Sequence, residues 1–220
     1  MSRADIFASI QRGLGRRQAS AAERAAVEQR LNAKAPNLIP ARGQLSGEAL
    51  QQLFISMAQE ASAEIIELTR IQEVPQAAAL WLQEKGIEEL VLASDPELQA
   101  LDWSSTQGVL RREGVAQAGD LASLTLAFAG IAETGTLMLY SHPDSPTSLN
   151  FLPDNHLLIL RRVDLVGVYE EAWNKLRTQV GENWPRTVNM ITGPSRSADI
   201  EQKLQMGAHG PRRLVIFLID

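Results

Sequence analysis

The sequence predicts an α/β protein in which helices cover a mainly parallel sheet. Helical and strand-like patterns alternate with short links between residues 46 and 93, as expected for a sheet covered by helices. Four near-continuous apolar runs lie at 89–93, 157–160, 188–191 and 214–219. Such runs are typical of strands buried on both faces of a parallel sheet. Hydrophobic residues make up 45% of the 220-residue chain, so it can bury a full core.

Residues 1–45 predict a helical N-terminal arm followed by a linker. The segments Ala4–Arg16 and Ala21–Lys34 contain many helix formers but few large apolar side chains, so we expect peripheral helices. The proline-bounded stretch Pro36–Pro40 is typical of a solvated linker. Residues 46–220 are expected to form one α/β domain.

The domain begins with two helix and strand pairs. An amphipathic helix that starts near Ser46 is predicted by four apolar residues at helical spacing, Leu50, Leu53, Phe54 and Met57. A strand is expected at Glu64–Leu68. A second helix follows, with Ala77, Leu80 and Trp81 on its apolar face and its end at Lys85-Gly86, and it leads into the strand at 89–93.

The middle of the chain is rich in expected strands. Candidates are Gly114–Ala118, Leu121–Ala129 and Leu137–Tyr140. The second could instead be helical, because Leu124 and Phe128 lie four residues apart. The sequence alone leaves these two readings open.

A strongly amphipathic helix is expected between the strands at 157–160 and 188–191. One side of it carries the large apolar side chains Leu165, Tyr169, Trp173 and Leu176. We expect that side to pack on the central sheet, which would contain both flanking strands.

The composition excludes several classes of function. The chain contains no cysteine, so it offers no thiol nucleophile and no cysteine ligand for zinc or an iron–sulfur cluster. A net charge of -5 argues against general nucleic-acid binding. The histidines lack HxxxH or HExxH spacing, so no metal site is predicted. No apolar run approaches the ~20 residues of a membrane span and the start has no secretion signal, so we expect a cytoplasmic protein.

The strongest candidate ligand site follows the apolar strand at 188–191. We expect that strand to lead into a short helix, at a carboxyl strand end where open α/β sheets bind ligands. Gly193 would let a ligand approach the backbone, and first-turn N–H groups with Arg196 would suit a carboxylate or phosphate. Asp199 would repel an anion, so it could instead accept hydroxyls or pair with Arg196. An ordinary capped turn is the alternative.

Two further candidates lie on either side of that segment. Glu133 stands beside a glycine turn, where a carboxylate could act as nucleophile, general base or ligand acceptor. It could equally lie in a solvated hairpin bulge. His209 lies between two glycines, Gly207 and Gly210, before the last strand and could transfer a proton near neutral pH.

We predict that these segments leave the same edge of the sheet and line one pocket. Glu133 is the predicted catalytic residue. The predicted ligand-binding residues are Thr134, Gly135, Thr136, Asn155, Gly193, Pro194, Ser195, Arg196, Asp199, His209 and Gly210.

Four segments taken together resemble the LUD domain family. They are Ile131–Leu137 (IAETGTL), Leu152–His156 (LPDNH), Thr192–Glu201 (TGPSRSADIE) and Gly207–Pro211 (GAHGP). More narrowly, the chain is similar to the bacterial lactate-utilisation protein C family, also called the YkgG family. The motifs cover residues 131–211, the element spacing fits from about Ser46, and the N-terminal arm matches only in being helical.

The resemblance implies a three-layer α/β/α sandwich of the NagB/RpiA/CoA-transferase type. It also implies a metal-free subunit of a system that oxidises L-lactate to pyruvate, with iron–sulfur clusters carried by partner proteins. We expect an anionic small-molecule ligand, and the chain could form homo-oligomers. Two alternatives stay open: a stand-alone enzyme of the CoA-transferase or sugar-phosphate isomerase type, and a metabolite-sensing regulatory module.

Overall fold

The computed structural model describes residues 2–15, 17–33, 38–104, 106, 108–197, 205–206 and 209–220. The chain divides into two units, Met1–Leu38 and Ile39–Asp220. The first contains helices α1 (Arg3–Gly13) and α2 (Ala21–Ala33), and neither has a buried residue. The helical N-terminal region is therefore present, and its small complement of large apolar side chains explains the exposure. None of the helices in the described residues is long and apolar enough to cross a membrane.

A six-stranded sheet forms the centre of the second unit, and every neighbouring pair in it is parallel. Its spatial order is β1 (Glu64–Leu68), β12 (Arg213–Ile219), β7 (Asn155–Arg161), β4 (Ala122–Leu126), β2 (Glu89–Leu92) and β3 (Leu110–Glu113). The three middle strands are almost entirely buried. Burial on both faces explains their apolar runs and confirms the predicted α/β class.

A second sheet of four strands was not anticipated. Its order is β8 (Leu165–Val166), β5 (Ala129–Ile131), β6 (Thr136–Tyr140) and β9 (Val188–Ile191). Strand β9 pairs antiparallel with β6, so its predicted place in the central parallel sheet was wrong. An apolar run of four residues predicts a buried strand but carries no information about its partner, and β9 is only half-buried. A short antiparallel pair, β10 (Arg196–Ser197) and β11 (Gln205–Met206), follows β9.

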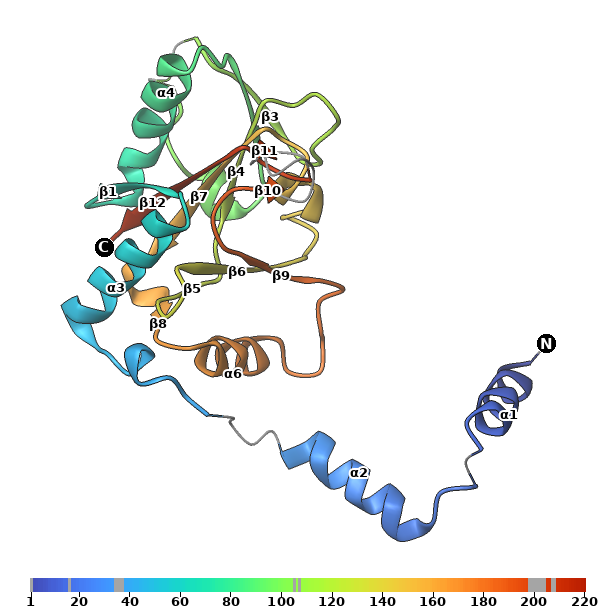
Figure 1. Cartoon of the computed structure of the whole chain (residues 1–220). Coiled ribbons are helices and arrows are strands. Elements are labelled where there is room, and N and C mark those ends of the chain that lie inside the picture. The colour runs from blue at the N-terminus through green and yellow to red at the C-terminus, as the bar shows by residue number, and fades with distance from the viewer. Residues whose placement is uncertain are drawn as a thin grey trace. The chain divides into compact units, whose positions relative to one another are not determined.

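Helices cover the two faces of the central sheet differently (Figure 1). One face packs against α4 (Val74–Glu84) and the short α5 (Pro96–Gln99), which contribute Ala78, Leu82 and Leu98 to the core. The other face packs against α3 (Gly47–Glu60) and the second sheet. The remaining helical turns are η1 (Ala41–Gly43), η2 (Ile71–Glu73), η3 (Thr147–Asn150) and η4 (Arg162–Asp164).

Helix α6 (Tyr169–Val180) packs on the second sheet rather than the central one. Its buried residues Ala172 and Leu176 lie in one apolar cluster with Ile131 and Met138. Tyr169, Trp173 and Leu176 do pack on one side of the helix, as predicted. Leu165 instead lies in β8, before the helix begins, and the predicted partner of the helix was wrong. The second sheet lies between α6 and the central sheet, which adds a layer (Figure 1).

Two expected strands have different bounds. The strand placed at 114–118 lies instead at Leu110–Glu113, and Gly114 with φ +103° ends it because that backbone conformation leaves the β region. The segment expected at 121–129 contains two strands, β4 and the start of β5, in different sheets. The helical alternative for this segment does not occur.

Candidate functional site

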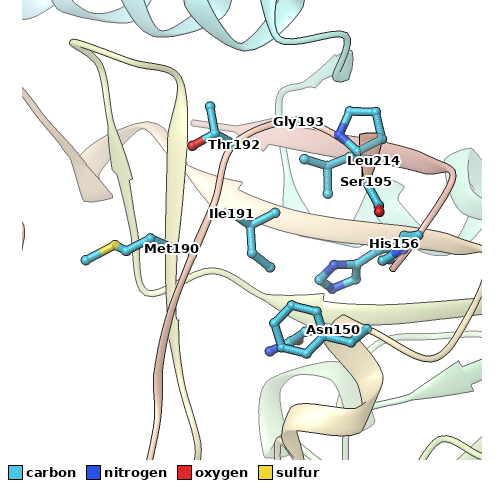
Figure 2. Close-up of a pocket in the computed structure, with 11 residues that line it drawn as sticks. Asn150, His156, Met190, Ile191, Thr192, Gly193, Ser195 and Leu214 are labelled. Carbon is cyan, nitrogen blue, oxygen red and sulfur yellow. The ribbon is translucent and has the colours of Figure 1, made fainter. Parts of the chain in front are cut away.

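A cavity of about 220 Å³ opens beside the loop that follows β9 (Figure 2). Its polar lining residues are Asn150, His156, Thr192 and Ser195. The rest of the wall is apolar and is formed by Phe151, Met190, Ile191, Gly193, Pro194, Pro211 and Leu214. The cavity therefore combines apolar side chains with a few polar groups, as small-molecule sites usually do.

The cavity lies at the amino ends of two central strands. His156 is the second residue of β7, and Leu214 is the second residue of β12. The sequence prediction placed the Gly193 loop at a carboxyl end of the central sheet. That loop does follow a carboxyl strand end, but the strand is β9 of the second sheet. The wrong sheet assignment for β9 therefore produced the wrong edge.

The helix expected after β9 is not formed within 192–197. Arg196 and Ser197 belong to β10, and the Ser195 N–H donates to the Pro211 carbonyl at 2.8 Å. This N–H was expected to face an anion and is already used within the protein. Asp199 lies outside the described residues.

Arg196 does not line the cavity. It is exposed, and its guanidinium donates to the carbonyl of Ala61 at the end of α3. Among the described residues that line the cavity, none is an aspartate, glutamate, lysine or arginine. The cationic group on which the anion prediction depended therefore points elsewhere.

His156 is the residue that the sequence prediction missed. Its side chain is fully buried, and Nε2 lies 2.8 Å from Thr125 Oγ1. Burial lowers the pKa of the imidazole to about 3, so it is neutral at physiological pH. Within the described part of the chain, its Nδ1 has no hydrogen-bond partner. Figure 2 shows the ring beside Ile191 and Asn150, where the cavity lies.

The LPDNH motif contained the signal for His156. The prediction selected Asn155, but neighbouring side chains of a strand point to opposite faces. Asn155 donates to the Leu121 carbonyl at 2.7 Å and accepts from Arg213, so its amide is held outside the cavity. One residue further along the strand, the same motif places the imidazole in the cavity wall.

Asn150 supplies a second polar group without a partner. It is the last residue of η3 and is 4% exposed. Its Oδ1 has no hydrogen-bond partner among the residues described. Buried polar groups are nearly always satisfied, so two unsatisfied groups in one wall indicate a place for a ligand or ordered water.

A cluster of four hydroxyls joins this wall to the predicted Glu133 segment. Thr136 Oγ1 lies 2.7 Å from Thr134 Oγ1, 2.9 Å from Tyr169 Oη and 2.6 Å from Thr192 Oγ1. Thr134 and Tyr169 lie 3.0 Å apart and close the ring. Three hydrogen bonds thus form a ring among Thr134, Thr136 and Tyr169. Each hydroxyl has one proton, so these three bonds use the protons of all three residues. Thr192 must therefore donate to Thr136, which leaves Thr192 with only lone pairs for the cavity.

Glu133 is buried and holds the start of α6. Its Oε1 accepts from the backbone N–H of Tyr169 at 3.2 Å, and its own N–H donates to the Gly167 carbonyl at 3.1 Å. A carboxylate at this position stabilises the helix N-terminus. Glu133 is not among the residues that line the cavity, so the structure brings Thr136 and Thr192 together but separates Glu133 from Gly193 and Ser195.

Two motif glycines permit close packing on α3, and one of them, Gly193, also lines the cavity. Gly135 has φ +63° and Gly193 has φ +68°, conformations that favour glycine. A Cβ on Gly135 would overlap the backbone of Ala58, and a Cβ on Gly193 would overlap the carbonyl of Ala61. Both glycines therefore pack on the last turn of α3, which holds their two loops near each other.

The predicted His209 and Gly210 lie beside the loop, although the cavity wall does not include them. The His209 N–H donates to Ser195 Oγ at 3.3 Å, and a Cβ on Gly210 would contact Ser195. The His209 side chain is exposed. These contacts place the residues at the side of Ser195, with no described contact to His156.

Comparison with known proteins identifies extensive similarity. Residues 48–219 match the model of the LUD domain. YkgG of Escherichia coli is 29% identical over 194 residues, which cover 80% of this chain and 82% of that protein. Lactate utilization protein C of Bacillus pumilus is 29% identical over 196 residues, 81% of each chain. The crystal structure of a DUF162 family protein from Deinococcus radiodurans has a TM-score of 0.61 at 22% identity, covers 80% of this chain and 99% of that one, and shows the same fold.

Proposed function

This chain belongs to the LUD domain family, and from that premise we propose that it acts in lactate utilisation. The observation that carries the proposal is the match to a lactate utilization protein C over 81% of both chains. Several other proteins with that name match over shorter lengths. A shared fold would be a weaker argument, because one fold supports many functions.

We place the chain in a cytoplasmic system that oxidises L-lactate to pyruvate. This oxidation releases two electrons and two protons, so it needs an electron acceptor. The absence of cysteine from the chain means that an iron–sulfur acceptor would need ligands from another protein. The proposed role is therefore that of a subunit whose partner proteins hold the iron–sulfur clusters.

The alternative of a stand-alone CoA-transferase-like enzyme depends on Glu133 as the reactive group. Glu133 is 5% exposed and accepts a backbone hydrogen bond from α6. This contact gives the residue a structural role without any reaction. No contact in the described residues favours the alternative over the proposal.

A gene deletion in the source organism tests the proposed function. The deletion strain should fail to grow on L-lactate, should grow normally on pyruvate, and should recover when the intact gene is returned. Extracts of the strain should also lose L-lactate oxidation, and the tagged chain should co-purify with proteins that contain iron and labile sulfide. Unchanged growth and unchanged oxidation would contradict the proposal.

Two outcomes would support the alternatives. Turnover of an acyl-CoA or a phosphosugar by the purified chain alone would indicate a stand-alone enzyme. Normal oxidation by a reconstituted system that lacks this chain, with altered expression of the system in the deletion strain, would indicate a regulatory module.

A further inference from the structure

None of the described residues that line the cavity beside His156 is an aspartate, glutamate, lysine or arginine, in contrast to the anion site expected from the sequence. We propose that this cavity binds an uncharged molecule with an apolar body and an amide or hydroxyl head, in preference to a free carboxylate or phosphate. The inference rests on the proposed function only in treating the cavity as the ligand site of a lactate-utilisation subunit.

Electrostatics carries the first step of the argument. An anion that leaves water needs a cation or several strong donors in the site. The described wall contains no lysine or arginine, and Arg196 donates to Ala61 instead. The Ser195 N–H is used by Pro211, and His156 is neutral because it is fully buried. A bound carboxylate would therefore lose its hydration without a charged partner.

The polar groups of the wall suit a neutral head. Asn150 Oδ1 accepts hydrogen bonds, and Thr192 presents only lone pairs because its proton goes to Thr136. Nδ1 of the neutral His156 can accept or donate, according to which ring nitrogen carries the proton. A primary amide has N–H donors for the two oxygens and a carbonyl that can accept. A carboxylate has acceptors only, so it can form no hydrogen bond with Asn150 Oδ1 or with the lone pairs of Thr192.

The remaining wall accommodates an apolar body. Phe151, Ile191 and Leu214 line the cavity beside the two unsatisfied polar groups. A volume of about 220 Å³ accommodates a molecule larger than lactate, such as one aromatic ring with a short head. The ligand would thus place its apolar part on these side chains and its head on His156 and Asn150.

A matched pair of probes tests the preference for a neutral head. Benzamide and benzoate have almost the same shape, and they differ in charge and in the presence of N–H donors. Titration of the full-length chain, followed by NMR of ¹⁵N-labelled protein, measures both dissociation constants. For probes of this size we expect a benzamide dissociation constant of about 1 mM. Benzoate and L-lactate should bind about tenfold more weakly or worse.

Substitutions in the wall locate the binding. Asn150→Leu and His156→Leu should each weaken benzamide binding about tenfold, and benzamide should shift the His156 ring signals of the wild-type protein. His142→Asn is the matched control, since it removes a histidine outside this cavity and should leave the affinity unchanged. Asn150→Leu keeps the test available if His156→Leu fails to fold, because it leaves the His156–Thr125 bond in place.

Three results would overturn the inference. They are benzoate or L-lactate binding as tightly as benzamide, binding of neither aromatic probe, and binding of benzamide that neither wall substitution weakens. The growth test for the proposed function uses no probe and does not depend on this preference. A loss of growth on L-lactate combined with any of these results would retain the function and reject the uncharged ligand.

Discussion

Replacement of Glu133 distinguishes a structural carboxylate from a catalytic one. Glu133→Ala removes the acceptor for the Tyr169 N–H at the first residue of α6 and leaves that donor without its partner. A hydrogen bond to a charged group contributes about 1.5–3 kcal/mol. Loss of a negative charge at a helix N-terminus adds about 0.3–1 kcal/mol. We therefore expect Glu133→Ala to lower the free energy of unfolding by about 2–4 kcal/mol.

Glu133→Gln should have a smaller effect, because the amide oxygen can still accept from Tyr169. Only the charge at the helix N-terminus is lost, so the expected decrease in unfolding free energy is about 0.3–1 kcal/mol. A catalytic nucleophile would show the opposite pattern. The glutamine variant would then retain stability and lose all activity, whereas a structural Glu133 predicts nearly normal growth on L-lactate.

Urea unfolding followed by circular dichroism measures these differences. With an m-value of about 2 kcal/mol/M, Glu133→Ala should lower the midpoint by about 1–2 M. Glu170→Ala is the control, since it removes a carboxylate from the same first turn of α6 that makes no hydrogen bond in the described structure. If Glu133→Ala and Glu170→Ala shift the midpoint equally, the capping argument is refuted.

Three further predictions test the packing, the buried histidine and the division of the chain. Gly135→Ala should cost more than about 3 kcal/mol or prevent folding, because its Cβ would overlap Ala58. Gly181→Ala, also at positive φ but with open space around it, should cost less, about 1–3 kcal/mol, in the same urea assay. His156 has a pKa of about 3 in the folded state, so below its ordinary value of about 6.5 the unfolded chain gains a proton that the folded protein does not. Stability should therefore fall by about 2 kcal/mol between pH 7 and pH 5, and His156→Gln should lack this component; equal pH dependence of the two proteins would contradict it. Removal of residues 1–38 should change the free energy of unfolding of the remaining unit by less than about 0.5 kcal/mol in the urea assay, since α1 and α2 bury no residue. A larger loss would show that α1 and α2 stabilise the remaining unit.

The local patterns of the sequence were sufficient for the class of fold. Helix α3 has the spacing of apolar residues that predicted it, and its buried Phe54 lies on the predicted face. The apolar runs at 157–160 and 214–219 correspond to β7 and β12, which pair in parallel at the centre of the larger sheet. These features depend on residues that are close in sequence, so periodicity reveals them.

Strand partners could not be read from the same patterns. The run at 188–191 resembles a central parallel strand, yet β9 pairs antiparallel with β6 in the second sheet. Pairing depends on contacts between residues about fifty positions apart and on competition among all strands. The error displaced the predicted site, because the loop after β9 meets the amino ends of β7 and β12 rather than a carboxyl edge of the central sheet.

The sequence by itself determined the family motifs, the absence of cysteine ligands and the residues that can make polar contacts. Only the tertiary structure decided which of those residues face the cavity. Glu133 caps α6 and Arg196 contacts α3, whereas His156 is buried and its Nδ1 has no partner among the residues that the structure describes. The physical reason is that a side chain's chemistry follows from its type, but its solvation, charge state and partners follow from segments that folding brings together.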